Sequence, residues 1–332
     1  MIVDIHTHIA GVETENNRNY CGGRMSSGFL FRLFMRELGV PWNGMAKPGT
    51  DELIKNRVLR LINESCIDRA VILSLDGVYR EDGSFDKGKT SLTVDNDYVA
   101  DIADIGGKAL FGASIHPYRR DAIAELDRLA ARGACLVKWL PSSQHIQPDN
   151  PRCFPFYDRL AHHQIPLLCH TGNEHTVTGG DNRLNDPQRL VPALERGVTV
   201  IAAHCGARMY LHERCYFSSW RKMALEYPNC FGDVGAFIIP TRIRYLRILR
   251  NDPRLLSKIV YASDFPAQAV TMSCLFSLGL RKTLFLRKIR NPFDAPYRIL
   301  KEMGFPDEVF DRGRSLLKIP AGHSRIATGI TR

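Results

Sequence analysis

The sequence lacks several features that would mark whole classes of protein. No apolar run approaches the roughly 18 to 20 residues that a membrane-spanning helix needs. The first residues are strand-like, where a secretory signal would otherwise lie. No CxxC spacing occurs among the nine cysteines, which are odd in number and scattered over 332 residues. A disulfide framework is therefore not expected, and we predict a cytoplasmic protein with reduced thiols.

Acidic residues are in deficit, and the deficit is local. The chain has 45 Lys and Arg against 35 Asp and Glu, a formal charge of +10. Residues 241–290 hold eleven of these cations but only two acids, Asp252 and Asp264, so the local charge is 11 minus 2, or +9. Such an excess can attract an anionic substrate, a membrane surface or nucleic acid. For the basic run 281–290 the pattern favours a solvated or substrate-attracting surface, with no specific binding of nucleic acid.

Hydrophobic patterning indicates the fold class. Apolar residues make up 44% of the chain and charged residues 24%, which is enough for a large core and excludes a disordered or coiled-coil protein. Short β-branched runs recur, and most alternate with helix-like stretches. The expected strands are 2–6, 70–75, 109–115, 135–140, 166–170, 198–204, 230–235 and 258–264. The expected helices include 51–65, 95–105, 121–132, 156–163, 187–196 and 242–250. This alternation predicts an α/β fold, the (β/α)8 or TIM barrel.

Two segments exceed the usual connection length of about 2 to 6 residues and are expected to be functional additions. The first, 9–49, contains an apolar helical stretch at 29–38 that could cover the barrel mouth as a lid. The second begins at residue 265 and forms a helical C-terminal extension that reaches residue 320. We thus expect one barrel domain over 1–320, followed by a flexible tail at 321–332.

The active site of such a barrel lies where the strands end, so polar residues at these ends are the candidates. They are His6, His8, Lys138, His170, His204 and Asp264. Because residues i and i+2 of a strand point to one side, His6 and His8 can offer two nitrogens to one cation, and Asp4 shares this parity. With His170 and Asp264 they form a set of three nitrogens and one oxygen. This set suits Zn²⁺ and tolerates Mn²⁺, Fe²⁺ or Co²⁺.

Seven short motifs, which cover both ends of the chain and most strands, carry a family resemblance. They are DIHTH at 4–8, SIHP at 114–117, LVKWLP at 136–141, PLLCHTG at 166–172, VIAAHCG at 200–206, YASDFP at 261–266 and RNPFD at 290–294. The chain resembles the amidohydrolase superfamily, specifically its second amidohydrolase family, which includes aminocarboxymuconate semialdehyde decarboxylase. The resemblance implies that the metal ligands are His6, His8, His170 and Asp264. It implies that His204 is the catalytic acid or base, or a ligand of a second metal. TatD-type deoxyribonucleases share the HxH opening, but their acidic motif on strand 4 is missing here.

Lys138 departs from the decarboxylase branch of that family, whose members have no obvious carboxylatable lysine on strand 4. Dinuclear members of the superfamily use a carboxylated lysine at this point to bridge two metals. A lysine here can instead pair with a substrate carboxylate or a neighbouring acid, and carboxylation requires a neutral amine. We therefore expect one divalent transition metal, zinc first, with a second metal only if Lys138 is carboxylated.

Other residues of the rim are candidates for substrate contact. His116 precedes a proline at the end of strand 3, where fixing the turn explains it as well as binding substrate does. Glu174 and His175 follow strand 5 in a loop that could bind substrate or be solvated. In the lid segment, Arg32 and Arg36 share a helix face and could clamp a carboxylate or simply face solvent.

These observations predict a metal-dependent hydrolase for a small, anionic substrate: a carboxylated ester, lactone, amide or compound with a cleavable carbon–carbon bond. Asp264 would take a proton from the activated water, and His204 would stabilise the oxyanion or protonate the leaving group. The first alternative is a metal-dependent, non-oxidative decarboxylase in which His204 gives the proton to carbon. The second is a barrel whose basic 241–290 surface binds an anionic membrane or nucleic acid. The intact set of metal ligands argues against this alternative, because a binding module does not need an open metal position. A homo-oligomer is compatible with the sequence.

Overall fold

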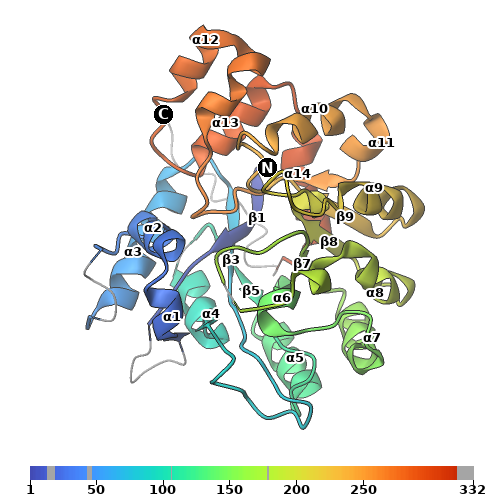
Figure 1. The fold of residues 1–332 in the computed structure, drawn as a ribbon. Helices are drawn as coiled ribbons and strands as arrows, with labels where there is room; N and C mark the ends of the chain where they lie inside the picture. The colour runs from blue at the N-terminus through green and yellow to red at the C-terminus, as the bar shows by residue number, and fades with distance from the viewer. Residues whose placement is uncertain (13–18, 43–46, 106, 178, 320–332) are drawn as a thin grey trace.

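Eight parallel strands form the centre of the molecule in the computed structural model, which describes residues 1–12, 19–42, 47–105, 107–177 and 179–319 (Figure 1). In order around the sheet they are β1 (Val3–His8), β3 (Arg69–Leu73), β5 (Ala109–Ala113), β6 (Leu136–Trp139), β7 (Leu167–His170), β8 (Val200–Ala203), β9 (Cys230–Asp233) and β10 (Ile259–Val260). The two ends of the sheet meet where the N–H of Asp264 donates to the carbonyl of His6 at 2.9 Å and the N–H of His8 donates to that of Phe265 at 2.7 Å. The predicted (β/α)8 barrel is confirmed.

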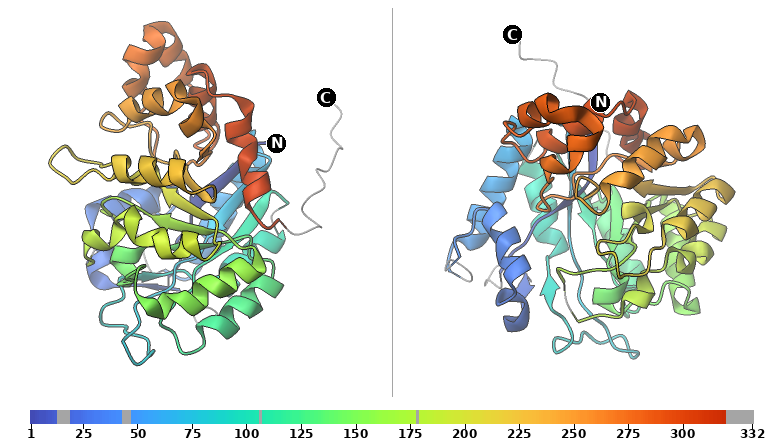
Figure 2. Two further views of the ribbon diagram at one scale, coloured as in Figure 1. Left: turned by 90° about the vertical axis from the view of Figure 1, so that its right-hand side faces the viewer. Right: turned by 45° about the horizontal axis from the view of Figure 1, so that its top comes forward.

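Helices surround the strands (Figures 1 and 2). The longer ones are α3 (Thr50–Glu64), α4 (Asn96–Ile105), α5 (Ala122–Ala131), α7 (Phe154–His163), α9 (Phe217–Glu226), α10 (Ile243–Asn251) and α14 (Asp307–Leu316), and the shorter ones are α6 (Pro141–Gln144), α8 (Val191–Glu195) and α11 (Pro253–Leu256). Each longer helix buries an apolar stripe, as Ile54, Val58 and Ile62 do at four-residue spacing in α3. The expected helix 187–196 divides into a 3-10 turn and α8, because Pro192 lacks an amide hydrogen and fits only the first turn of a helix.

Alternation along the strands separates an apolar barrel interior from an outer shell. On β3, Val71 belongs to the interior cluster, while Ala70 and Ile72 pack with the surrounding helices. The interior cluster also includes Val3, Ile5, Leu73, Leu110, Leu136, Leu168, Ile201, Val260 and Ala262. Polar side chains follow this cluster toward the C-terminal ends of the strands, so the candidate site lies directly above an apolar layer.

Helix α14 fills the seam between β1 and β10. A Cβ at Gly313 would lie 2.8 Å from Val3 Cγ1 and 2.9 Å from Ile5 Cγ2, so only glycine allows this approach. The backbone N–H of Tyr261 donates to the carbonyl of Val309 on the helix at 3.1 Å. The sequence predicts a C-terminal helical extension but not its place in the seam.

The two additions to the barrel contain further elements. The first holds α1 (Gly23–Ser26) and α2 (Phe29–Glu37), and the second holds α12 (Leu275–Leu286) and α13 (Asp294–Glu302). An antiparallel pair that the sequence did not predict, β2 (Tyr20–Cys21) with β4 (Leu92–Thr93), ties the first addition to the segment after β3. The expected tail 321–332 lies outside the described residues. None of the described helices has the length and apolar character to cross a membrane.

Candidate metal centre

A β-bulge in β1 brings both histidines of the HxH motif into the barrel. The register of β1 against β3 shifts between Asp4 and Thr7. As a result, Ile5 and His6 together oppose one residue of β3. Ile5 packs in the interior cluster, and Nε2 of His6 lies 3.0 Å from Nε2 of His8, as the motif predicted. The inward parity expected for Asp4 was wrong, because its carboxylate accepts hydrogen bonds from two backbone N–H groups at the seam.

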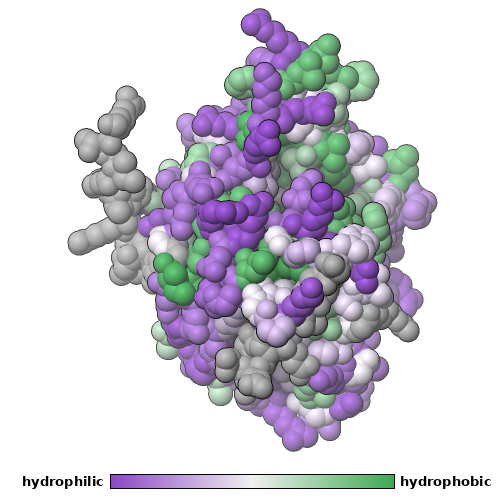
Figure 3. All heavy atoms as spheres, turned by 90° about the vertical axis from the view of Figure 1, so that its left-hand side faces the viewer, coloured by the Kyte–Doolittle hydropathy of each residue, from purple (hydrophilic) through white to green (hydrophobic). Residues whose placement is uncertain are grey.

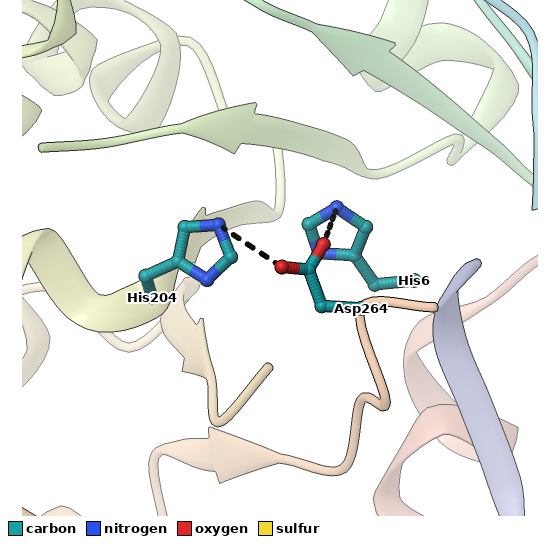
Figure 4. Close-up of side chains that lie close together, drawn as sticks. All are labelled: His6, His204 and Asp264. Carbon is teal, nitrogen blue, oxygen red and sulfur yellow. Dashed lines mark ion pairs between the residues drawn. The ribbon is translucent and has the colours of Figure 1, made fainter. Parts of the chain in front are cut away.

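Asp264 lies between His6 and His204 and turns one oxygen toward each of them (Figure 4). Its Oδ1 is 3.3 Å from Nε2 of His6 and 3.4 Å from Nε2 of His8. Its Oδ2 is 4.0 Å from Nε2 of His204. Ligand atoms of His6, His204 and Asp264 all lie within 4.8 Å of one another, and the three residues are buried. This buried group is consistent with a divalent metal ion.

Asp233, at the end of β9, holds the ring of His6 and the backbone of His204, and was not predicted. Its Oδ2 lies 2.8 Å from Nδ1 of His6, and its Oδ1 accepts the backbone N–H of His204 at 2.9 Å. The carbonyl of Gly235 accepts from Nδ1 of His204, also at 2.9 Å. With the proton on Nδ1 in both rings, both Nε2 atoms turn their lone pairs toward Asp264. Burial lowers the pKa of both imidazoles, which keeps them neutral as metal ligation requires.

His170, at the end of β7, adds a fourth ring. Its Nδ1 lies 3.5 Å from Oε2 of Glu174, whose other oxygen accepts two backbone N–H groups. The ring centroid is 5.0 Å from that of His204. Its Nε2 is buried and has no hydrogen-bond partner in the described part of the chain. A buried nitrogen without a partner is costly, and a cation beside it would remove that cost. The donor set and this nitrogen together fit a divalent metal.

Backbone strain is concentrated at the same place. His204 and Asp264 both have φ of 60°, in the left-handed region that L-residues rarely adopt. Each such residue costs about 1–3 kcal/mol unless its surroundings hold it there. The backbone bond from His204 to Asp233 and that from Asp264 to His6 provide this hold. Strain at two strand ends that face each other supports a functional role for both residues.

Lys138, on β6, lies beside the ring of His6. Its side chain is fully buried, and Nζ lies 3.1 Å from Nε2 of His6. Burial lowers the pKa of this amine. Lys138 is not among the described residues that line the cavity in front of the group.

Two of the residues predicted to contact substrate differ in position: His116 lies in the turn after β5, whereas His175 lines the cavity. Nε2 of His116 donates to the carbonyl of Gln144 at 2.9 Å, and its Nδ1 accepts the N–H of Tyr118 at 3.1 Å. Burial lowers the pKa of His116 to about 3, so both bonds are made by a neutral ring that fixes the turn after β5. His175 lines the cavity, but its Nε2 lies 2.7 Å from Oε1 of Glu213.

A cavity of about 410 Å³ opens in front of the cluster of histidines around Asp264. Its polar floor is formed by His8, His170, His204 and Asp264. Its roof is apolar and comes largely from α2, with Leu30, Phe31, Leu33, Phe34 and Met35. Within the described chain Arg32 and Arg36 do not line it, and Nε of Arg32 donates to the carbonyl of Ser26. The volume is that of a site for a small molecule.

The arginine that does line the cavity is Arg242, which the sequence did not single out. It is only 4% exposed, and the one hydrogen bond of its side chain within the described residues runs from Nε to the carbonyl of Arg208 at 3.4 Å. No carboxylate of those residues forms an ion pair with it. Burial lowers the pKa of this guanidinium, and the charges of nearby carboxylates, Asp264 first, oppose that shift. Because Arg242 belongs to the basic 241–290 stretch, the sequence suggested that its side chain lies on the surface.

Comparison with solved structures shows the fold. An uncharacterized TIM-barrel protein of Bordetella bronchiseptica is similar with a TM-score of 0.57 and 16% identity, over 91% of this chain and 99% of that one. A Staphylococcus aureus protein provisionally named an amidohydrolase has a TM-score of 0.51 and 11% identity, over 96% and 99%. The 5-carboxyvanillate decarboxylase LigW of Sphingomonas paucimobilis has a TM-score of 0.50 and 10% identity, also over 96% and 99%. No family model matches the sequence, and no curated protein is significantly similar to it. The likeness establishes a barrel shared with amidohydrolase-type proteins, as the motifs predicted.

Proposed function

We propose that the protein is a metal-dependent hydrolase of the amidohydrolase type. The observation that carries the proposal is the convergence of four imidazoles and one carboxylate, of which all but His6 line the floor of an apolar cavity. His6, His8, His170 and Asp264 would hold one divalent cation. Three neutral imidazoles and a carboxylate suit zinc best and also allow manganese, iron or cobalt.

The remaining side chains suit proton transfer. A bound cation of this kind lowers the pKa of water and polarises a substrate oxygen. Asp264 would accept the proton of the attacking water on Oδ2 and pass it to the free Nε2 of His204, 4.0 Å away, which would then deliver it to the leaving group. The carbonyl of Gly235 fixes the ring of His204 through Nδ1 and Asp233 holds its backbone, so that Nε2 faces the reacting atoms. His204 thus acts as acid and base rather than as a ligand.

Arg242 and the cavity wall define the substrate. One buried guanidinium without an ion pair accounts for one carboxylate, and a planar carboxylate matches its paired N–H donors. The apolar side chains of α2 account for the rest of the molecule, which lies under this helix. The substrate is therefore a small ester, lactone or amide with one carboxylate and an apolar body.

We also propose that α2 is the lid of a single barrel domain over 1–320.

Metal analysis with a substrate panel tests the proposal. Purified protein should contain about one transition metal ion per chain by elemental analysis, and removal by a chelator should abolish hydrolysis of carboxylated aryl esters or lactones reversibly. His6→Ala should lose the metal. His204→Ala should keep it and lose most turnover. Full hydrolysis by metal-free protein would refute the proposal.

A second candidate, non-oxidative decarboxylation, is favoured by the position of Arg242. This side chain holds a carboxylate in the cavity that also contains His204, which could supply the proton to carbon. The fold is also shared with a 5-carboxyvanillate decarboxylase. Product analysis separates the two reactions, because a decarboxylase releases CO₂ and incorporates no oxygen from labelled water, whereas a hydrolase incorporates it.

A further inference from the structure

The segment from Val270 to Lys288 carries large apolar side chains on the outside of the molecule. Phe276 is fully exposed and Phe285 is 69% exposed. Val270, Met272, Leu280 and Leu284 are also exposed. We call these six side chains the apolar face. A group of this size, concentrated on one short stretch, marks an interaction site rather than ordinary surface.

Helix α12 carries most of the apolar face because little of it is needed for the core. Of its residues only Thr283 and Leu286 are buried, and Gly279 interrupts the helix with φ of 76° and ψ of 164°. Leu280 and Leu284 are four residues apart in the second half of the helix, so they lie on one side of it, and that side faces away from the core. In Figure 1 the helix lies at the edge of the molecule, above α13.

Positive charge is interleaved with the apolar face. Arg281, Lys282, Arg287 and Lys288 are all exposed. Lys282 pairs with Glu302 at 2.9 Å, but the other three form no ion pair within the described chain. Figure 3 shows hydrophobic and hydrophilic side chains side by side at the top of the molecule, where α12 lies. We propose that α12 docks on the surface of an anionic phospholipid bilayer, with the apolar face in the acyl boundary and these cations among the headgroups.

A second copy of the chain would fit this surface poorly. A symmetric dimer that buried the apolar face would enclose three cations of each chain without a carboxylate to pair with them, and burial of unpaired charge is costly. Nucleic acid would pair with the cations but would leave Leu280, Leu284 and Met272 in water, because aliphatic side chains do not stack on bases as aromatic ones do. A bilayer satisfies both kinds of side chain at once.

The docking surface adjoins the mouth of the cavity. Val270 belongs to the apolar face and also lines the cavity, and Leu33 of α2 lines it from the other side while remaining exposed. A substrate with one carboxylate and an apolar body would concentrate in a bilayer and could enter from it. This consequence rests on the proposed function, whereas docking itself depends only on α12.

Vesicle flotation of the full chain tests the docking. Wild-type protein should bind phosphatidylcholine vesicles that contain phosphatidylglycerol and should bind pure phosphatidylcholine much less. The double variant Phe276→Ser/Phe285→Ser should bind about tenfold or more weakly, since each phenyl group contributes hydrophobic transfer energy. Arg287→Gln/Lys288→Gln should lose the preference for anionic lipid and its salt dependence. Ile105→Ser, a control on an exposed residue of α4, should bind like wild type.

Several results would overturn the inference. They are the absence of binding to anionic vesicles, binding that the double variant leaves unchanged, and conversion of a wild-type dimer to a monomer by the double variant in light scattering, which would assign the surface to a second copy. Tighter binding to a single-stranded oligonucleotide than to vesicles would assign it to nucleic acid. Metal content and circular dichroism of each variant verify the fold. If the protein docks while its metal-loaded form hydrolyses no member of the substrate panel, the docking stands and the proposed function fails.

Discussion

The barrel interior has two layers, which come from the same strands two residues apart. On β6, Leu136 lies in the apolar layer and Lys138 in the polar one. On β7, Leu168 precedes His170 by the same step. The lower layer is an apolar cluster with no polar atoms to satisfy, whereas every side chain of the upper layer is ionisable. One full period of a strand is thus enough to change from packing to chemistry.

The difference shows how the fold distributes stability. In the upper layer, His204 and Asp264 have strained backbones, and His170 has a buried nitrogen without a partner in the described chain. Such features each cost free energy, and they persist only where the surrounding structure holds them. The lower layer and the helices around it supply that hold through hydrophobic burial. If this division is correct, substitutions in the two layers should change different properties.

The largest effect is expected in the upper layer from Asp264→Asn. Asparagine tolerates the left-handed backbone at this position, so the fold should be kept. Loss of the charge removes the oxygen pair that His6, His8 and His204 share, so metal occupancy should fall and turnover should drop by about 10³-fold or more. Elemental analysis, kinetics and thermal melting measure the three properties. Normal metal content and turnover in this variant would show that the carboxylate is not part of the site.

The lower layer should respond in the opposite way to Leu168→Ala. This side chain is fully buried in the interior cluster, so its truncation leaves a cavity and should cost about 2–5 kcal/mol of stability. The metal content of the folded fraction should remain at the wild-type value. Thermal melting and elemental analysis check both statements. A loss of metal without a loss of stability would show that the layers are not separate.

The sequence predicted most of the fold because its signals are local. β-branched runs that alternate with helical patterns identified all eight barrel strands. The bulge in β1 could not be predicted, because DIHTH has the plain alternation of a regular strand and the shift appears only in its pairing with β3. The position of α14 was missed for a similar reason. Gly313 faces Val3 and Ile5, which lie at the other end of the chain.

The site was predicted to the extent that strand ends identify it. His6, His8, His170, His204 and Asp264 lie together as the strand order implies. Asp233 lies within the predicted strand 230–235 and ends the observed β9, so a search of the last residues of each predicted strand could have identified it. Arg242 carries no such signal: it precedes a helix in a basic stretch, and only the tertiary structure shows that it is buried at the cavity.

A smaller effect should come from Asp233→Asn, which sharpens the role of the orienting carboxylate. The side-chain amide can donate to Nδ1 of His6, which would move the ring proton to Nε2 and remove the lone pair from the metal side. Affinity for zinc should fall by about 10–100-fold, as is typical when the partner of a metal-binding histidine is removed. Competition with a chelating dye measures it. Asp252→Asn, at a half-buried helix cap that asparagine also suits, is the matched control and should leave zinc affinity unchanged.

The smallest effect on metal count should come from Lys138→Met, although this residue is fully buried in the upper layer. A dinuclear site would require a carbamate on Nζ, yet Nζ already lies 3.1 Å from Nε2 of His6, which leaves no room for three additional atoms without movement of β1 or β6. One cation has sufficient donors without it. Methionine keeps the length of the side chain and removes a buried amine, so the fold should be retained.

The prediction for Lys138 is therefore that metal per chain stays near one in wild type and in Lys138→Met, with or without bicarbonate during reconstitution. Elemental analysis of the four samples decides it. If bicarbonate raised the wild-type count to about two and Lys138→Met abolished the second equivalent, the lysine would be a bridging ligand. His204, whose Nε2 lies within 4.8 Å of ligand atoms of His6 and Asp264, would then have to be reassigned from proton transfer to metal binding. The polar layer would in that case hold two cations, and its separation from the apolar layer below would be sharper still.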